Sequence, residues 1–188
     1  MLIVIDGLDA SGKSTQALQL SMFLARKGKT VCLRSHPSGD NFFGLRTKQF
    51  LHSSGKSAHF ASAFFYMMDV VRSILLYTWQ KYDYLIFVRY LMGTAYLPSP
   101  LHGIAYRFFA LVVPKPNAMF FLDIPPDEAR RRIVQARKDH EIFEHITELR
   151  KVREKVLSLA LVGNWTVIRA NRPMAEIGRD IQGSLGIS

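Results

Sequence analysis

The chain has 188 residues, of which 48% are hydrophobic and 21% charged, and these values predict one globular domain with a sizeable core. Cys32 is the single cysteine, which argues against a disulfide framework or a zinc cluster. The sequence has no apolar run of about 18 residues and no basic, cleavable start. We therefore expect no transmembrane helix, no secretory signal and a cytoplasmic location. The net charge of +10 suits an anionic partner, either a nucleic acid or a small polyanion such as a nucleotide.

The start of the chain contains a phosphate-binding loop in the context that such a loop needs. Residues 2–5 are apolar and mostly β-branched, which predicts a buried strand. Residues 7–14 read Gly-Leu-Asp-Ala-Ser-Gly-Lys-Ser, a full match to the pattern G-x-x-x-x-G-K-[ST]. From Ser14 onward, Leu18, Met22 and Ala25 recur near helical spacing and predict a helix that ends at Gly28. A chance match to this pattern in a Gly/Ser turn would not be expected to have both a strand before it and a helix after it.

Each part of this loop has a chemical use. Gly7 and Gly12 let backbone N–H groups turn inward around a phosphate, and the helix N-terminus adds partial positive charge. Lys13 supplies a charge for the β- and γ-phosphates, and the Ser14 hydroxyl is placed to ligate Mg²⁺. The pattern therefore predicts ATP and Mg²⁺ as cofactors.

The rest of the chain predicts strands that alternate with helices. Strands are expected at residues 30–34, 84–88, 118–124 and 165–168, and helices at 44–51, 58–81, 101–112, 125–138, 146–161 and from 173 onward. This alternation predicts an α/β fold, a three-layer P-loop sandwich whose five-stranded parallel sheet has helices on both faces. No linker or repeat divides the chain, so we expect a single domain over residues 1–188.

The helix expected at residues 58–81 is unusually apolar. One of its sides carries Phe60, Phe64, Met67, Val71, Leu75 and Thr78, which we interpret as a central packing face. The alternative is that the stretch from Phe60 to Leu76 forms a homodimer face.

Polar side chains follow several of the predicted strands. In open α/β sheets, ligands bind beyond the carboxyl ends of the strands. The candidates at those ends are Asp6, Asp9, Arg34, Arg89, Asp123, Asn171 and Arg172. Arginines and carboxylates around a phosphate loop suit phosphoryl transfer, because its transition state needs Mg²⁺ and cationic groups.

Two segments, residues 130–138 and 150–155, are densely basic. Neither has the interleaved aromatic residues of an RNA-binding surface. Glu148 and Glu154 lie among the charges of the second segment, which indicates a solvated helix face. We therefore expect no nucleic-acid partner. The first segment, extended to about residue 145, is either a lid that closes over phosphates and excludes water or an exposed basic helix.

Four stretches of the chain, in order, resemble thymidylate kinases. Residues 5–16 are similar to the opening of that family, and Phe-Leu-Asp-Ile-Pro-Pro-Asp-Glu-Ala at 121–129 to its fourth strand and following helix. Arg137-Lys138-Asp139 with Phe143-Glu144 resembles the family's lid, and Ala170 to Pro173 resembles the stretch that contacts the ATP base. The resemblance implies ATP-dependent phosphorylation of a nucleoside monophosphate substrate, dTMP to dTDP, and a homodimer.

The resemblance also implies residue roles. Asp9 would face the acceptor sugar 3′-hydroxyl, Arg34 and Arg89 would grip the acceptor phosphate, and Arg137 would reach the transferring phosphates. The candidate catalytic residues are thus Lys13, Arg89 and Arg137, and Ser14 is the candidate metal ligand. The candidate nucleotide-binding residues are Gly7, Asp9, Ala10, Ser11, Gly12, Lys13, Ser14, Thr15, Arg34, Phe64, Asn171 and Arg172.

The sequence departs from the family pattern at two positions. The family's Asp-Arg-Tyr is Val88-Arg89-Tyr90 here, and valine cannot help to hold Mg²⁺, so either Asp6 or Asp123 acts through water or activity is weak. Phe64 stands where the family carries an arginine that reads thymine, so it would offer stacking in place of hydrogen bonds. The alternatives left open are a kinase for another nucleotide or nucleoside, and a nucleotide-binding protein with little or no turnover.

Overall fold

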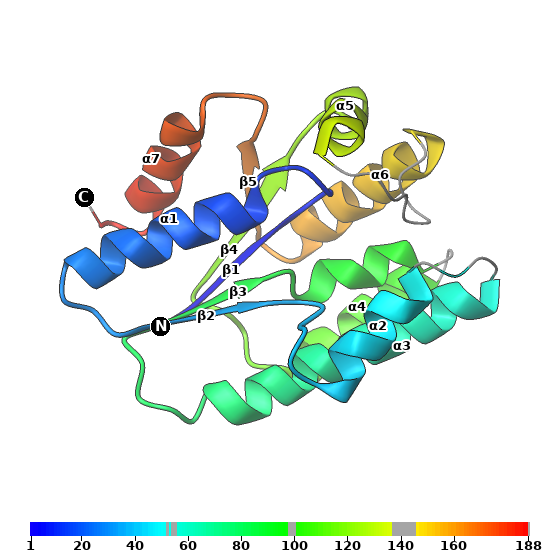
Figure 1. Ribbon diagram of the computed structural model, residues 1–188, viewed down its shortest axis with the longest axis horizontal. Coiled ribbons are helices and arrows are strands. Elements are labelled where there is room, and N and C mark those ends of the chain that lie inside the picture. The colour runs from blue at the N-terminus through cyan, green and yellow to red at the C-terminus, as the bar shows by residue number, and fades with distance from the viewer. Residues whose placement is uncertain (52, 54–55, 98–100, 137–145, 188) are drawn as a thin grey trace.

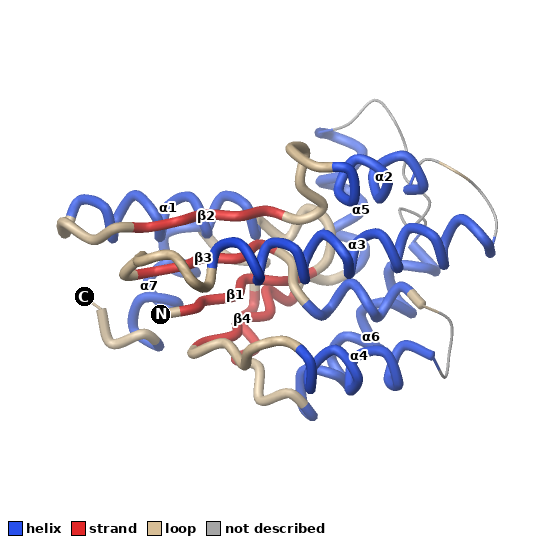
Figure 2. Tube along the Cα trace, turned by 90° about the horizontal axis from the view of Figure 1, so that it is seen from below, coloured by secondary structure: helices blue, strands red, loops and turns tan. Residues whose placement is uncertain are grey.

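The computed structural model describes residues 1–51, 53, 56–97, 101–136 and 146–187, and it confirms the predicted α/β fold (Figure 1). The strands are β1 (Leu2–Gly7), β2 (Val31–Ser35), β3 (Tyr84–Val88), β4 (Ala118–Asp123) and β5 (Thr166–Arg169). They form one sheet in the order β2-β3-β1-β4-β5, and each neighbouring pair is parallel. Figure 2 shows β2, β3, β1 and β4 side by side in one layer.

Helices lie on both sides of the sheet. On one side are α1 (Lys13–Arg26) and α7 (Met174–Ser184), and on the other are α2 (Phe42–Leu51), α3 (Lys56–Tyr77), α4 (Leu101–Val112) and α6 (Ile146–Val162) (Figure 1). A 3₁₀ helix, η1 (Leu91–Tyr96), follows β3, and α5 (Pro126–Ala136) follows β4 and packs against α6.

The alternation of side chains along β1 creates two cores. Leu2 and Val4 join the cluster formed with α3, α4, η1 and α6, whereas Ile3 and Ile5 join the cluster formed with α1 and α7. All four side chains are buried because a central parallel strand is covered on both faces. This burial fixes the register of β1 and therefore the position of the loop that follows it.

The apolar residues whose spacing predicts α1 are not the ones that it buries. On α1, Leu18 and Met22 are about half exposed, and Ala17, Leu20 and Leu24 face the sheet instead. Both sides of this helix carry apolar residues, so spacing alone does not identify the buried one.

On α3, the predicted packing face is correct at Met67 and wrong at three other positions. Phe60, Phe64 and Leu75 are 44%, 59% and 62% exposed, while Tyr66, Met67, Val70 and Ile74 are buried. This helix is apolar on most of its circumference, and its stretch Phe60–Tyr77 is long and apolar enough to cross a membrane by length and composition alone. Its buried residues belong to the larger of the two cores. A core helix can meet the same criteria of length and composition as a membrane-spanning helix.

The sheet order places the loop after β1 at a topological switch point. From β1 the chain moves to β2 and β3 on one side, and then returns across β1 to β4 and β5 on the other. The loops at the carboxyl ends of β1, β3 and β4 therefore diverge around one crevice, where ligands of such sheets bind.

Candidate active site

The loop between β1 and α1 has the backbone geometry of a phosphate cradle. Gly7 has no room for a side chain, because a Cβ there would lie 2.6 Å from both the Leu122 carbonyl oxygen and Ser11 Oγ. Gly12, with φ of 89°, is in the left-handed region and immediately precedes α1, which begins at Lys13. Ser11 Oγ is buried and has no hydrogen-bond partner among the described residues. A phosphate oxygen would fill that requirement, so the loop fits ATP.

Lys13 lies beneath this loop and is 4% exposed. Its Nζ donates to the Leu8 carbonyl oxygen at 2.5 Å and lies 3.7 Å from Asp9 Oδ1. Burial, helped by the nearby Arg89 charge, lowers the pKa of Lys13 to about 8. An anion bound beside the amine would restore the preference for the charged form.

Arg89 comes to the same place from the end of β3. Its backbone is left-handed, with φ of 63°. Its guanidinium donates to Asp9 Oδ1 through Nη2 and to the His36 carbonyl oxygen through Nη1 at 3.2 Å. The structure thus brings together Lys13, Asp9 and Arg89, as expected from strand ends that are far apart in sequence.

Asp6 and Asp123, the two carboxylates expected near a metal, both accept hydrogen bonds from other parts of the chain. Asp6 is buried, and its oxygens accept from the backbone N–H groups of Gly7 at 2.8 Å and Tyr90 at 2.9 Å; burial raises its pKa. Asp123 accepts two hydrogen bonds from Arg153, each 2.7 Å long. Both therefore serve to join neighbouring segments.

Val88 also offers nothing to a cation. It is 1% exposed and packs in the core on the α1 side of the sheet. Within the described part of the chain there is no group of three or more His, Cys, Asp or Glu side chains suited to a metal. The exposed Ser14 hydroxyl at the first turn of α1 fits Mg²⁺ in combination with phosphate oxygens, because Mg²⁺ commonly takes few protein ligands and keeps several waters.

A cavity of about 720 Å³ opens over the loop. Its walls come from the loop and α1, from Arg89, from α5, and from the connection that leads into α7. The sequence candidates that line it are Asp9, Ala10, Ser11, Gly12, Lys13, Ser14, Thr15, Arg89 and Arg172. Gly7 lies at the base of the loop, and Asn171 is an exposed neighbour of Arg172 that does not line the cavity.

Two arginines of α5 line the cavity, although the sequence indicated only a basic segment there. Arg131 and Arg132 both donate to Glu128 at 2.7 Å, and Arg132 Nη1 also donates to the Ala10 carbonyl oxygen at 3.3 Å. The two guanidinium groups lower the pKa of Glu128 to about 2. The signal that could have separated them from Arg130 is their spacing of three and four residues from Glu128.

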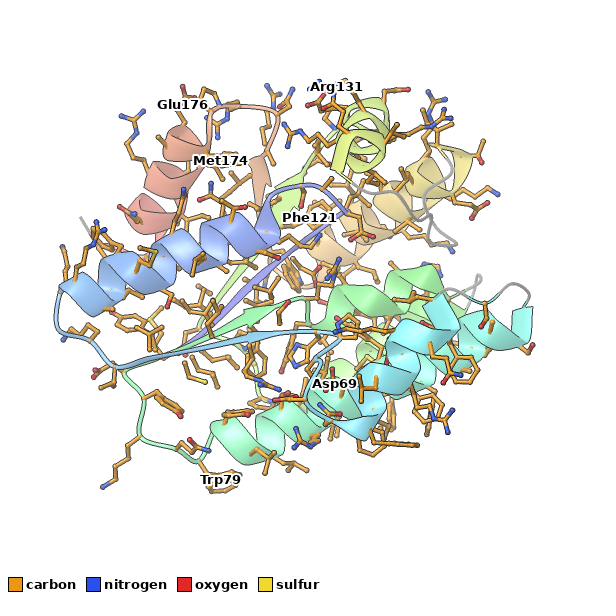
Figure 3. The ribbon with its side chains drawn as sticks, in the orientation of Figure 1. Asp69, Trp79, Phe121, Arg131, Met174 and Glu176 are labelled. Carbon is orange, nitrogen blue, oxygen red and sulfur yellow. The ribbon has the colours of Figure 1, made fainter. Side chains whose placement is uncertain are left out.

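Residues from α7 complete the wall opposite α5. Met174 and Ile177 contribute apolar surface to the cavity, and Figure 3 shows Met174 on α7 and Arg131 on α5, both in the upper part of the view. Apolar surface beside arginines is suited to a nucleotide, whose base is flat and whose phosphates are charged.

Two sequence candidates lie away from this cavity. Arg34 pairs with Asp40 through two hydrogen bonds of 2.7 and 2.9 Å and lies over the Tyr77 ring at 4.7 Å. Phe64 is on the exposed side of α3, with its ring edge-on to Phe65. The structure does not bring either to the phosphate loop. Arg137, and most of the predicted lid with it, lies outside the described residues.

Comparison with known proteins agrees with this geometry. The model of the thymidylate kinase family matches residues 5–181. The probable thymidylate kinase of Pyrobaculum calidifontis is 28% identical over 186 residues, covering 96% of this chain and 93% of that protein. That of Thermococcus kodakarensis is 32% identical over 177 residues, covering 85% and 84%.

A solved structure supports the fold independently. The structure of thymidylate kinase from Candida albicans superposes with a TM-score of 0.75 at 19% identity, covering 98% of this chain and 90% of that one. Since the family model spans nearly the whole chain, including the phosphate loop and the strand ends described above, this protein belongs to the thymidylate kinase family of ATP-dependent phosphotransferases.

Proposed function

We propose that the protein transfers the γ-phosphoryl group of ATP to dTMP, giving dTDP and ADP. The observation that carries this proposal is the convergence of Lys13, Asp9 and Arg89 at the phosphate loop, under a cavity large enough for a nucleotide. The curated relatives named above are probable thymidylate kinases, and this supports dTMP as the acceptor.

ATP is proposed to lie with its phosphates on the loop from Gly7 to Ser14. Backbone N–H groups and Lys13 would bind the β- and γ-phosphates, and the base would lie toward Arg172 and Met174. Mg²⁺, held by Ser14 and phosphate oxygens, would neutralise charge on the triphosphate. Arg132, which already contacts the loop at Ala10, would add positive charge from the predicted lid over residues 130–145.

The acceptor phosphate is proposed to approach Arg89. An oxygen of the acceptor phosphate forms a bond to the γ-phosphorus. At the same time the bond between the γ-phosphorus and the β–γ bridging oxygen breaks, and ADP leaves with that oxygen. An acceptor phosphate is already an anion near neutral pH, so no protein general base is needed. Asp9 would accept from the sugar hydroxyl while it also orients Arg89.

A coupled assay tests this proposal directly. Purified protein with ATP and Mg²⁺ is offered dTMP, dUMP, UMP, CMP and AMP in turn, and turnover is followed as ADP release. Turnover of dTMP above the others is expected, and turnover of another monophosphate alone would reassign the acceptor. Nucleotide binding without transfer to any of them would leave a nucleotide-binding protein without kinase activity.

The remaining sequence predictions belong to the same proposal. We propose that the enzyme is a single-domain protein of the cytoplasm, where its nucleotide substrates are, and that it forms a homodimer through α3. The support for the dimer is the apolar surface that Phe60, Phe64, Leu75 and Leu76 expose. Light scattering after size exclusion is expected to give twice the chain mass, and Leu75→Arg to give the monomer; a monomeric parent protein would refute the dimer.

A further inference from the structure

His36 joins the end of β2 to the end of β3. It is fully buried, and its backbone N–H donates to the Val88 carbonyl oxygen at 3.0 Å. Its ring Nδ1 lies 3.0 Å from the Arg89 carbonyl oxygen, and Arg89 donates to the His36 carbonyl oxygen in return. Because a carbonyl oxygen only accepts, Nδ1 must carry the ring proton.

The second ring nitrogen of His36 makes no hydrogen bond to the described residues. Nε2 is buried and without a hydrogen-bond partner there, and the ring edge packs against Phe87 with centroids 5.2 Å apart. Burial lowers the pKa of His36, which favours the neutral ring at pH 7. A leucine would fill such a position equally well, apart from the bond that Nδ1 donates.

The bond from His36 Nδ1 is made to Arg89, a residue whose backbone conformation is uncommon. Arg89 has a φ of 63°, a conformation that a residue with a long side chain keeps only where its surroundings hold it. The two hydrogen bonds between His36 and Arg89, with the Asp9 contact, restrain both the backbone and the guanidinium of Arg89.

The segment that carries His36 is itself held by α3. Asp69, fully buried on α3, accepts from the Ser38 N–H at 2.7 Å, from Ser38 Oγ at 2.5 Å and from Asn41 Nδ2 at 2.8 Å (Figure 3). The loop after β2 is thus fixed within two residues of His36. A ring held this way can restrain its neighbour.

We propose that His36 is a positioning residue for phosphoryl transfer: its Nδ1–H···O bond holds the Arg89 backbone in the conformation that directs the guanidinium to Asp9 and the phosphate loop. The role of Arg89 rests on the proposed function. His36 acts through Arg89 and touches neither nucleotide.

Two substitutions separate this role from simple packing. His36→Asn keeps an amide N–H near the place of Nδ1, whereas His36→Leu fills similar space without a donor. We expect His36→Leu to raise the KM for dTMP and lower kcat, each by about tenfold, because small displacements of a binding group are costly, while the KM for ATP changes less than twofold. His36→Asn is expected to recover most of the loss. Leu159→Ala, in the core on α6, serves as a control that loses stability without moving either KM.

The proposal is overturned if His36→Leu leaves the KM for dTMP unchanged, or if the Asn and Leu variants lose activity equally. Should the leucine variant not fold, the tautomer of the unmodified protein decides, measured by long-range ¹H–¹⁵N NMR of the ring. The proton is expected on Nδ1 at pH 7. Turnover of dTMP by a protein with the proton on Nε2 would refute the role of His36 alone. The Nδ1–H tautomer without turnover of any monophosphate would refute the proposed function and, with it, this role.

Discussion

Replacing Lys13 by methionine should stabilise the free protein while removing its activity. The pKa of Lys13 is lowered from its usual 10.5 to about 8, so the folded state holds the charged amine less favourably than water does. That difference corresponds to about 3 kcal/mol at roughly 1.4 kcal/mol per pKa unit. Losing the bond to the Leu8 carbonyl oxygen costs about 1 kcal/mol, so Lys13→Met is expected to raise the free energy of unfolding at pH 7 by about 2 kcal/mol.

The same shift sets a pH dependence with a definite sign. Between pH 8 and 10.5 the unfolded chain binds the Lys13 proton and the folded chain releases it, so stability conferred through this group rises with pH across that window. Below pH 8 both states are charged and the full penalty remains. Lys13→Met should remove this rise, and saturating ATP should remove it from the parent protein, because phosphate favours the charged amine.

Urea unfolding at pH 7 and pH 10 measures both effects. A Lys13→Met variant that is less stable than the parent at pH 7 would refute the reasoning. So would a variant whose free energy of unfolding rises toward pH 10 as much as that of the parent. Lys81→Met, on an exposed residue between α3 and β3, is the control and should alter neither quantity beyond about 0.5 kcal/mol.

Three further substitutions test the site. Gly7→Ala should abolish nucleotide binding or folding, since its Cβ would meet the Leu122 carbonyl oxygen at 2.6 Å; an alanine variant that binds ATP normally by calorimetry would contradict this. Ala10→Gly should stabilise the protein by up to about 1 kcal/mol in thermal unfolding, because Ala10 has a φ of 59° and glycine adopts it without strain. Val88→Asp should lower the free energy of unfolding by about 3 kcal/mol, because it buries a carboxylate, yet raise kcat at saturating Mg²⁺ and ATP; equal kcat in both proteins would mean that another group already meets the metal's needs.

The elements with strong local signals could be predicted from the sequence. The strand at 84–88 and the helix at 101–112 have the expected bounds, and the unit from Leu2 through the loop to Arg26 has the expected order. Short β-branched runs, glycine pairs and proline breaks act within a few residues, so no tertiary information is needed to interpret them.

The errors arise where distant contacts decide the outcome. The resemblance to the kinase family implies that Arg34 grips the acceptor phosphate, whereas in the structure its guanidinium pairs with Asp40. The buried side of α3 is set by the core that it covers, and the spacing of its apolar residues does not identify that side. His36 gave no signal, because its partner Arg89 is 53 residues away.

The charges of the phosphate loop and of the end of β3 are linked through one carboxylate. Asp9 is the carboxylate shared by Lys13 and Arg89, and both cations lie in a partly desolvated place that lowers the pKa of the amine. Asp6 also acts on both cations, but burial raises its pKa and disfavours its charged form, so the site retains a requirement for negative charge. A triphosphate and an acceptor phosphate would each supply it, and the stability that the free protein gives up at Lys13 would return as binding energy when the phosphates arrive. A loop of backbone N–H groups accepts any phosphate, whereas Lys13 and Arg89, two cations from different strand ends that share Asp9 Oδ1, favour two phosphate groups at one site.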